Sequence, residues 1–137
     1  MKMLVRLAVV GALLAALAPA AALAAPKPQV ITLLSVQRSQ RQTGAKLLIK
    51  DDDYQGKRKV GSDTLTCTIA GNKAHCVAKI VFRAGSITAR FVITAAATAG
   101  RGTIIGGTGA YAGARGTLRY TNLNKNGTRT TVVLTLT

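Results

Sequence analysis

The sequence contains no glutamate and no tryptophan, and only four of its 137 residues are acidic. All four are aspartates, at positions 51, 52, 53 and 63, so acid–base chemistry has to draw on these, on the single histidine or on tyrosine. No serine lies in a sequence arrangement with histidine and aspartate that would indicate the catalytic triad of a hydrolase. With three tyrosines and two phenylalanines, the core must consist of Val, Ile, Leu, Ala and Thr.

The scarcity of acids leaves a formal net charge of +15, or +13 once Lys2 and Arg6 of the N-terminal segment are removed. A charge of this size can attract polyanions or an anionic cell surface. The basic residues are scattered, however, and no aromatic series lies among them as a stacking platform. The pattern therefore does not favour specific nucleic-acid binding.

The N-terminal 24 residues have the layout of a secretory signal peptide. A short basic start is followed by the apolar run 7–17 and by the small-residue stretch 18–25, with a small-x-small cleavage site that ends at Ala24. The alternative, a transmembrane anchor, would need a longer apolar segment and a basic flank after it. We expect a secreted or periplasmic protein whose mature chain, residues 25–137, is one domain without a transmembrane segment.

The mature chain is expected to be all-β. Short runs rich in Thr, Val and Ile alternate with Gly or Asn turns, and no helical period of useful length is present. The polar stretch 37–44 is interpreted as a loop and residues 51–56 as a turn. Eight runs suit a small antiparallel barrel or a sandwich. The predicted strands are 30–36, 45–50, 64–70, 74–83, 86–96, 103–105, 116–123 and 128–136.

The two cysteines are predicted to form a disulfide. Gly71-Asn72 is a two-residue hairpin signal, and closing that hairpin pairs Cys67 with Cys76 at a non-hydrogen-bonded position. Opposed Cα atoms there lie about 4.5 Å apart, a separation that a disulfide accepts. A metal pair with His75 and a pair of free thiols are the rival interpretations, but side-chain alternation directs His75 to the opposite face.

The same register gives the β-sheet one consistently apolar face. The other face mixes polar and β-branched residues, and could be a solvated surface, a lumen or a subunit contact. The run Asp51–Asp53 is interpreted as a solvated turn that offsets nearby Lys and Arg; a barrel mouth or a weak Ca²⁺ site is the alternative. No metal site is predicted. His75, a conceivable general base, is read as a surface residue.

Five glycines crowd residues 106–116, in the stretch "GGTGAYAGARG". A phosphate-binding loop would need a helix after it and an acidic residue further on, and neither follows. The glycines are therefore expected to allow bulges and tight bends of a strand, and no cofactor is predicted.

This stretch resembles the motif G-G-T-G-x-[FY]-x-x-A-x-G of the dirigent proteins and the allene oxide cyclase-like barrel family. The segment "GKRKVGSDTLTC", residues 56–67, is similar to one in secreted bacterial members. The resemblance covers roughly residues 45–122 and implies an eight-stranded antiparallel β-barrel, commonly trimeric in the plant members.

The resemblance also implies an activity: plant relatives bind small hydrophobic ligands and steer their cyclisation or radical coupling without a metal or organic cofactor. The arginine of the motif can face the ligand cavity there, which makes Arg115 a candidate ligand-binding residue together with Tyr111 at the aromatic position. The chain departs from the plant pattern by lacking an early Asp-containing segment, where it has "QRSQRQTGAKL" instead.

Three functions remain open. The first is a barrel that binds a small hydrophobic ligand or assembles as an oligomer, without evident catalytic machinery. The second is a cofactor-independent isomerase, cyclase or stereo-directing protein, which needs at least two polar groups that converge in a cavity. The third is a basic cell-envelope or polyanion-binding protein.

Overall fold

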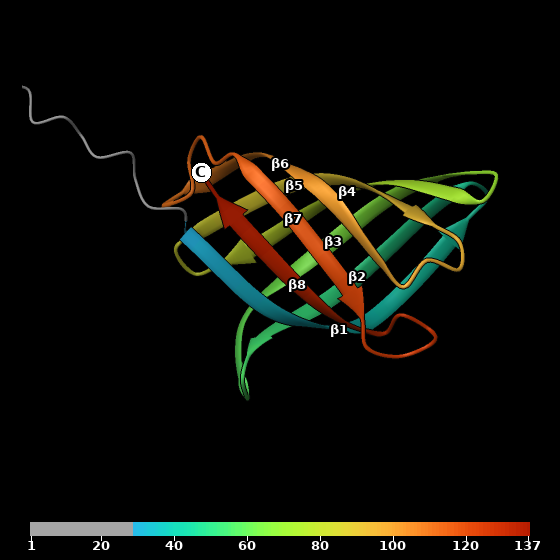
Figure 1. The fold of residues 1–137 in the computed structure, drawn as a ribbon, viewed down its shortest axis with the longest axis horizontal. Helices are drawn as coiled ribbons and strands as arrows, with labels where there is room; N and C mark the ends of the chain where they lie inside the picture. Colours follow the sequence, from blue (N-terminus) through green and yellow to red (C-terminus); the bar gives the residue numbers. More distant parts are fainter. Residues whose placement is uncertain (1–28) are drawn as a thin grey trace, which may run out of the picture.

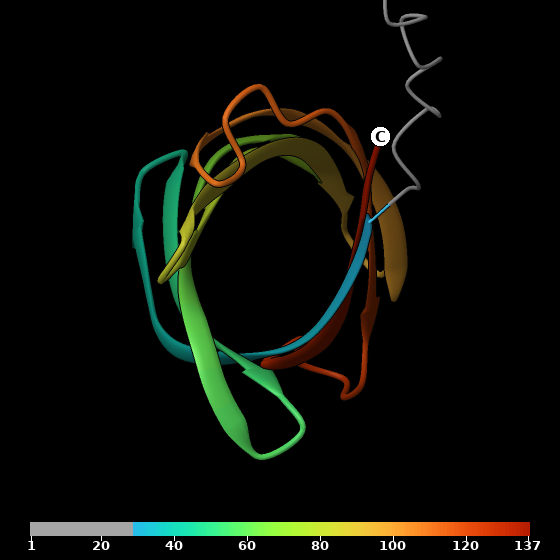
Figure 2. The same cartoon turned by 90° about the vertical axis from the view of Figure 1, so that its left-hand side faces the viewer.

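Eight antiparallel strands close into a barrel in the computed structural model, which describes residues 29–137. Each strand pairs with its sequence neighbour and β8 returns to β1, so no edge is left unpaired (Figures 1 and 2). The expected eight-stranded all-β fold is confirmed. The strands are β1 (Gln29–Thr43), β2 (Lys46–Gln55), β3 (Arg58–Ala70), β4 (Lys73–Phe82), β5 (Gly85–Thr94), β6 (Ala99–Gly109), β7 (Gly116–Asn122) and β8 (Arg129–Leu136).

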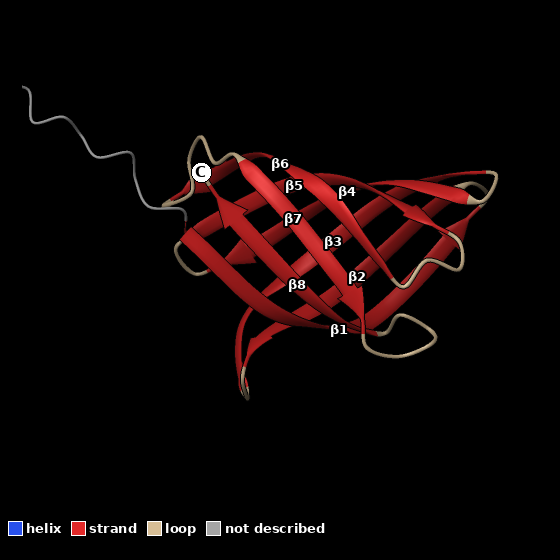
Figure 3. Cartoon of the chain, in the orientation of Figure 1, coloured by secondary structure: helices blue, strands red, loops and turns tan. Residues whose placement is uncertain are grey.

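Only turns and loops connect the strands in the described part of the chain (Figure 3). Residues 29–137 accordingly contain no helix with the length and hydropathy needed to cross a membrane. The predicted signal peptide, residues 1–24, and the expected start of the domain at residue 25 lie outside the described residues.

Alternation along each strand separates an inner from an outer face, as the β-strand period requires. The inner face carries the core, in which Leu33, Ile87, Ile104 and Leu134 are fully buried. The apolar face predicted for β3–β5 is this inner face, and the polar and β-branched face is the outside of the barrel. The β4–β5 turn consists of Arg83 and Ala84 and places Ile80 opposite Ile87, so the inward-facing residues of the two strands are paired.

The predicted disulfide is present. Cys67 and Cys76 face each other in the β3–β4 register with their Cα atoms 4.1 Å apart, and both side chains are buried. The predicted pairing of Cys67 with Cys76 is observed because the two-residue turn Gly71-Asn72 sets the register, which begins with Ala70 opposite Lys73. A disulfide is compatible with an oxidising, extracytoplasmic compartment.

Two predicted connections are strands instead. Residues 37–43, predicted as a loop, continue β1, and residues 51–55, predicted as a turn, continue β2. From Arg38 to Thr43 the first segment is exposed on both faces, where the hairpin projects beyond the barrel, so these residues need no burial (Figure 1). Gln37 is half-buried. The second was misjudged because three identical aspartates hide the alternation between lumen and solvent.

The glycines of residues 106–116 shape the sheet, as predicted. A Cβ at Gly107 would overlap the carbonyl oxygens of Ser86 and Tyr111, so only glycine permits this approach of three backbone segments. Gly109 has φ +60° and ends β6. A register shift between β5 and β6 lies just before the motif, which is the expected bulge.

Candidate functional site

The lumen of the barrel contains a cavity of about 370 Å³. It lies toward the end of the barrel formed by the β5–β6 loop, residues 95–98, and the β7–β8 loop, residues 123–128, both of which contribute lining residues. Most of the wall is apolar and comes from nearly every strand. Among these lining side chains are Leu33, Leu65, Ile80, Ile93, Leu118 and Val132.

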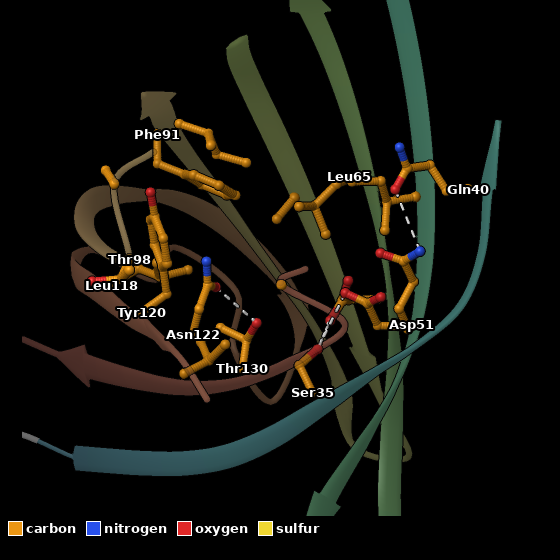
Figure 4. Close-up of a pocket in the computed structure, with 18 of the residues that line it drawn as sticks. Ser35, Gln40, Asp51, Leu65, Phe91, Thr98, Leu118, Tyr120, Asn122 and Thr130 are labelled. Carbon is orange, nitrogen blue, oxygen red and sulfur yellow. Dashed lines mark hydrogen bonds between the residues drawn. The ribbon is translucent and has the colours of Figure 1, made fainter. Parts of the chain in front are cut away.

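Three of the four aspartates line this cavity, and Figure 4 shows one of them, Asp51, beside Ser35. Asp51 and Asp53 are two residues apart on β2 and therefore share the inner face, and Asp63 on β3 is the cross-strand partner of Asp51. Asp53 and Asp63 are 0% and 6% exposed, so their carboxyl groups have almost no contact with bulk water.

The hydroxyl of Ser35, on β1, holds the three carboxyl groups together. Its Oγ lies 3.2 Å from Asp51 Oδ2, 2.9 Å from Asp53 Oδ1 and 3.0 Å from Asp63 Oδ2. A hydroxyl has one proton and can donate it to only one of these acceptors at a time. The second oxygens of Asp53 and Asp63 (Oδ2 and Oδ1) are buried without a partner. The cluster therefore needs at least one further proton, carried by a carboxyl group.

Electrostatics assign that proton to Asp63. Burial, followed by the charges of Asp53 and Asp51, raises the pKa of Asp63 from 3.8 to about 9. Burial is also the largest cause that raises the pKa of Asp51 and of Asp53. At neutral pH the wall thus presents a protonated carboxyl donor beside ionisable acceptors, the arrangement expected when carboxyl groups share one site.

Asp52, between the two lumen aspartates, has the opposite environment. Its side chain points outward, where Oδ1 lies 3.0 Å from Lys59 Nζ and 3.3 Å from an Arg38 guanidinium nitrogen. The hydrogen bond from Lys59 is the largest cause that lowers the pKa of Asp52. Asp52 is a surface ion-pair residue and provides a natural control for the lumen carboxyl groups.

An aromatic pair forms the wall opposite the carboxyl groups (Figure 4). The rings of Phe91 and Tyr120 lie 5.6 Å apart at 51°, a tilted arrangement favourable for aromatic contact. A Cβ at Gly100 would collide with the Tyr120 ring, so the glycine gives that ring its space. Burial raises the pKa of Tyr120.

Polar side chains surround the mouth of the cavity. Gln37 donates from Nε2 to Oε1 of Gln40 at 3.3 Å, and Thr130 donates to Oδ1 of Asn122 at 3.1 Å (Figure 4). Lys125 is the one lysine or arginine among the lining residues. The cavity therefore combines a hydrogen-bonding rim with apolar walls and the carboxyl cluster.

The residues predicted from the glycine motif lie away from this cavity. Arg115 is exposed, and its guanidinium donates to the carbonyls of Ile105 at 2.6 Å and Ala114 at 2.8 Å. Tyr111 packs its ring against Phe82 with centroids 5.5 Å apart. Neither side chain lines the lumen cavity, so neither belongs to the site formed by the carboxyl groups.

His75 lies on the outer face opposite Thr68 and Val92, as the alternation predicts. Within residues 29–137 no three His, Cys, Asp or Glu side chains are arranged to hold a metal ion.

The carboxyl cluster was missed as a site from the sequence. The available signal was the i, i+2 spacing of Asp51 and Asp53, which puts both on one face of a strand extended past Lys50. The turn at Gly56-Lys57 alone would place Ser62 opposite Asp51, and a register shift between Asp53 and Tyr54 brings Asp63 there instead. Ser35 carries no sequence signal at all.

The barrel is similar to several solved structures. One titled pyocyanin demethylase has a TM-score of 0.67 and 22% identity, with 80% of this chain and 100% of that chain covered. The pterocarpan synthase dirigent protein GePTS1 has a TM-score of 0.57 and 15% identity, over 80% and 83% of the two chains. The Diels Alderase AbmU from Streptomyces koyangensis has a TM-score of 0.60 and 11% identity, over 82% and 71%.

At these identities the likeness shows the fold alone. The predicted dirigent-like barrel is confirmed as a fold, shared by proteins whose titles name different chemistry. No protein-family model and no curated protein matches the sequence.

Proposed function

We propose that the lumen binds a small, largely apolar organic molecule that is neutral or cationic. The proposal rests on the cavity of about 370 Å³, which has a polar mouth, mostly apolar walls and one cluster of carboxyl groups. Its volume lies within the range of small-molecule sites, about 300–1,000 Å³. The titles of the structural neighbours, which name a demethylase, a pterocarpan synthase and a Diels Alderase, support a small-molecule ligand.

The charge of the lining sets the ligand class. Asp51, Asp53 and Asp63 line the cavity, whereas the only lysine or arginine of the lining is Lys125 at the mouth. An anionic group near the carboxyl cluster would meet like charge in a poorly hydrated site, which is unfavourable. A hydrogen-bond acceptor or a cationic group would instead find the protonated Asp63 or an ionised neighbour.

A matched pair of fluorescent probes tests this proposal. N-phenyl-1-naphthylamine is neutral, and its 8-sulfonate derivative differs by one anionic group. The neutral probe should bind at least tenfold more tightly to the lumen. Ala78→Leu, which fills lumen space, should abolish that binding, while Val77→Leu on the outer face of the same strand should leave it unchanged. Equal binding of the neutral probe to both variants contradicts the proposal.

A second candidate function is cofactor-independent isomerisation or cyclisation, favoured by the proton on Asp63. A protonated carboxyl beside ionised carboxylates can donate a proton to a bound ligand and recover one at a neighbouring oxygen, with no net change in protons. Two polar groups that converge in a cavity are the requirement for this function, and the candidates are Asp51 and Asp63, which are cross-strand partners in the cavity lining.

Deuterium exchange tests the catalytic proposal. A small unconjugated enone incubated with the protein in D₂O should isomerise with deuterium incorporation. Asp63→Asn should abolish the incorporation and Asp52→Asn, on the outer surface, should preserve it. Unchanged incorporation in the Asp63 variant would refute the acid role of this residue and would leave ligand binding intact as a separate proposal.

Ligand contact by Arg115 and Tyr111 stays a prediction. Arg115→Gln should weaken probe binding if the ligand reaches the motif end of the barrel. Because Arg115 is not among the residues that line the cavity and its guanidinium donates to the carbonyl of Ile105, we expect no effect of this variant on binding of the neutral probe.

We also propose that the chain is cleaved near Ala24 and acts outside the cytoplasm, which the disulfide supports. N-terminal sequencing of the exported protein tests the cleavage. The homotrimer implied by the resemblance is testable by light scattering on the mature protein.

A further inference from the structure

The outer surface of the barrel is strongly cationic because most of the acidic residues face the lumen. Three of the four acids face the lumen, so Asp52 is the one acid left outside. Residues 64–137, which form β4–β8 and the end of β3, contain nine lysines and arginines and no acid. This part of the wall is therefore cationic without any internal partner for its charges.

Three arginines are neighbours on this wall. Arg101 on β6 is the direct cross-strand partner of Arg119 on β7, and Arg90 on β5 faces Thr103, two residues from Arg101. All three are exposed and alternate with inward-facing core residues, so they share the outer face. Like charges directly opposite each other are destabilising, and both ion pairs within residues 29–137 involve Asp52 on the distant β2.

A hollow lies beside these arginines. It has a volume of about 430 Å³ on β4–β6, and its border includes the side chains of His75, Val77, Arg90, Val92, Arg101 and Thr103. Hydroxyl and guanidinium donors thus surround a recess that an anionic group can enter.

We propose that this arginine face, defined by Arg90, Arg101 and Arg119 with the hollow beside them, binds an acidic polysaccharide. The repeated anions of such a polymer match the row of cations across three neighbouring strands, and binding them relieves the repulsion between Arg101 and Arg119. Nucleic acid is disfavoured because the aromatic side chains of β4–β7 belong to the inner face or the ends of the barrel, which leaves no stacking platform.

Heparin affinity with two matched triple variants tests the site. The test variant is Arg90→Gln/Arg101→Gln/Arg119→Gln. The control, Arg41→Gln/Lys50→Gln/Lys57→Gln, removes the same charge from β1, β2 and the β2–β3 turn, across the closed barrel from β6. We expect the test variant to bind heparin at least tenfold more weakly at 0.1 M NaCl. Its slope of log K against log [NaCl] should fall by about two to three, roughly one for each lost contact. The control should lose much less.

Arg119→Glu separates binding from folding. The new carboxylate would face Arg101 across the strands, so thermal stability should rise while heparin affinity falls. If the two triple variants lost equal heparin affinity, heparin would be responding to the net charge of the protein alone, and the proposal would be overturned. Tighter binding of a DNA duplex than of heparin or alginate would overturn the polysaccharide assignment, as would no heparin retention at low salt. Binding of the neutral lumen probe should be unaffected in all of these variants, because the arginine face and the lumen lie on opposite sides of the sheet.

Discussion

Replacing Asp63 with asparagine should remove most of the pH dependence that the lumen cluster gives to stability. The folded protein holds the proton of Asp63 to a pKa of about 9, whereas the unfolded chain releases it near 3.8. Between pH 4 and pH 9, therefore, the folded state binds one more proton than the unfolded chain. The stability that this proton provides is complete below about pH 4 and is lost as the pH rises toward 9. Asparagine can keep the contacts of the protonated carboxyl because it both donates and accepts.

The magnitude follows from the proton that is retained. One proton corresponds to at most about 1.4 kcal/mol for each pH unit, so between pH 5 and pH 8 the limit is about 4 kcal/mol. Because the three carboxyl groups share the site, we expect about 2–4 kcal/mol, or a change in Tm on the order of 10 °C for a domain of this size.

Urea denaturation followed by circular dichroism measures this effect. As the pH rises from 5 to 8, the free energy of unfolding should fall more for the unaltered protein than for Asp63→Asn, and the difference should be about 2–4 kcal/mol. Parallel pH profiles of the two proteins, or a relative rise for the unaltered protein, would refute the assignment of the proton to Asp63.

Asp52 should contribute to stability with the opposite pH dependence from Asp63. Its lowered pKa stabilises the fold above about pH 4, so Asp52→Asn should be less stable than the unaltered protein at pH 7. The two proteins should be equally stable under acid conditions, as measured by the same denaturation series. Cys67→Ser/Cys76→Ser should lose about 2–3 kcal/mol of stability because the unfolded chain gains freedom; an unchanged denaturation midpoint would show that the cross-link has no such role. Gly107→Ala should fail to fold or lose several degrees of Tm because its Cβ overlaps two carbonyl oxygens, whereas Gly113→Ala, with open space around it, should bear only the cost of its positive φ, about 1 kcal/mol. Equal Tm values for the two alanine variants would contradict the close-approach argument.

The parts of the fold that could be predicted are those that local chemistry specifies. The turn at Gly71-Asn72 sets a register, and from that register the Cys67–Cys76 disulfide and the apolar inner face follow without any knowledge of the rest of the chain. The glycines near Gly107 were assigned to backbone bending because the following residues lack a helical pattern. These inferences need only neighbours in one hairpin or one segment.

The carboxyl cluster could not be predicted in the same way because it depends on closure of the barrel. Ser35 reaches the aspartates only because β1 pairs with β2 after a bulge near Gln37 shifts its register. Polar composition also favoured a loop for residues 37–44, where a projecting hairpin can be polar on both faces. The direction of Arg115 similarly depends on the β6–β7 connection that carries it, because its guanidinium donates to the carbonyls of Ile105 on β6 and of Ala114 in the connection.

The central claim is that the lumen carries a carboxyl group that stays protonated at neutral pH. The chain has four aspartates and no glutamate, so selective ¹³C labelling of the aspartate carboxyl carbons gives a spectrum with four side-chain signals. Titration followed by NMR should show one signal, assigned to Asp63 by its loss in Asp63→Asn, that stays at the protonated position past pH 7 and changes near pH 9. Four carboxyl signals that all titrate below pH 5 would contradict the account.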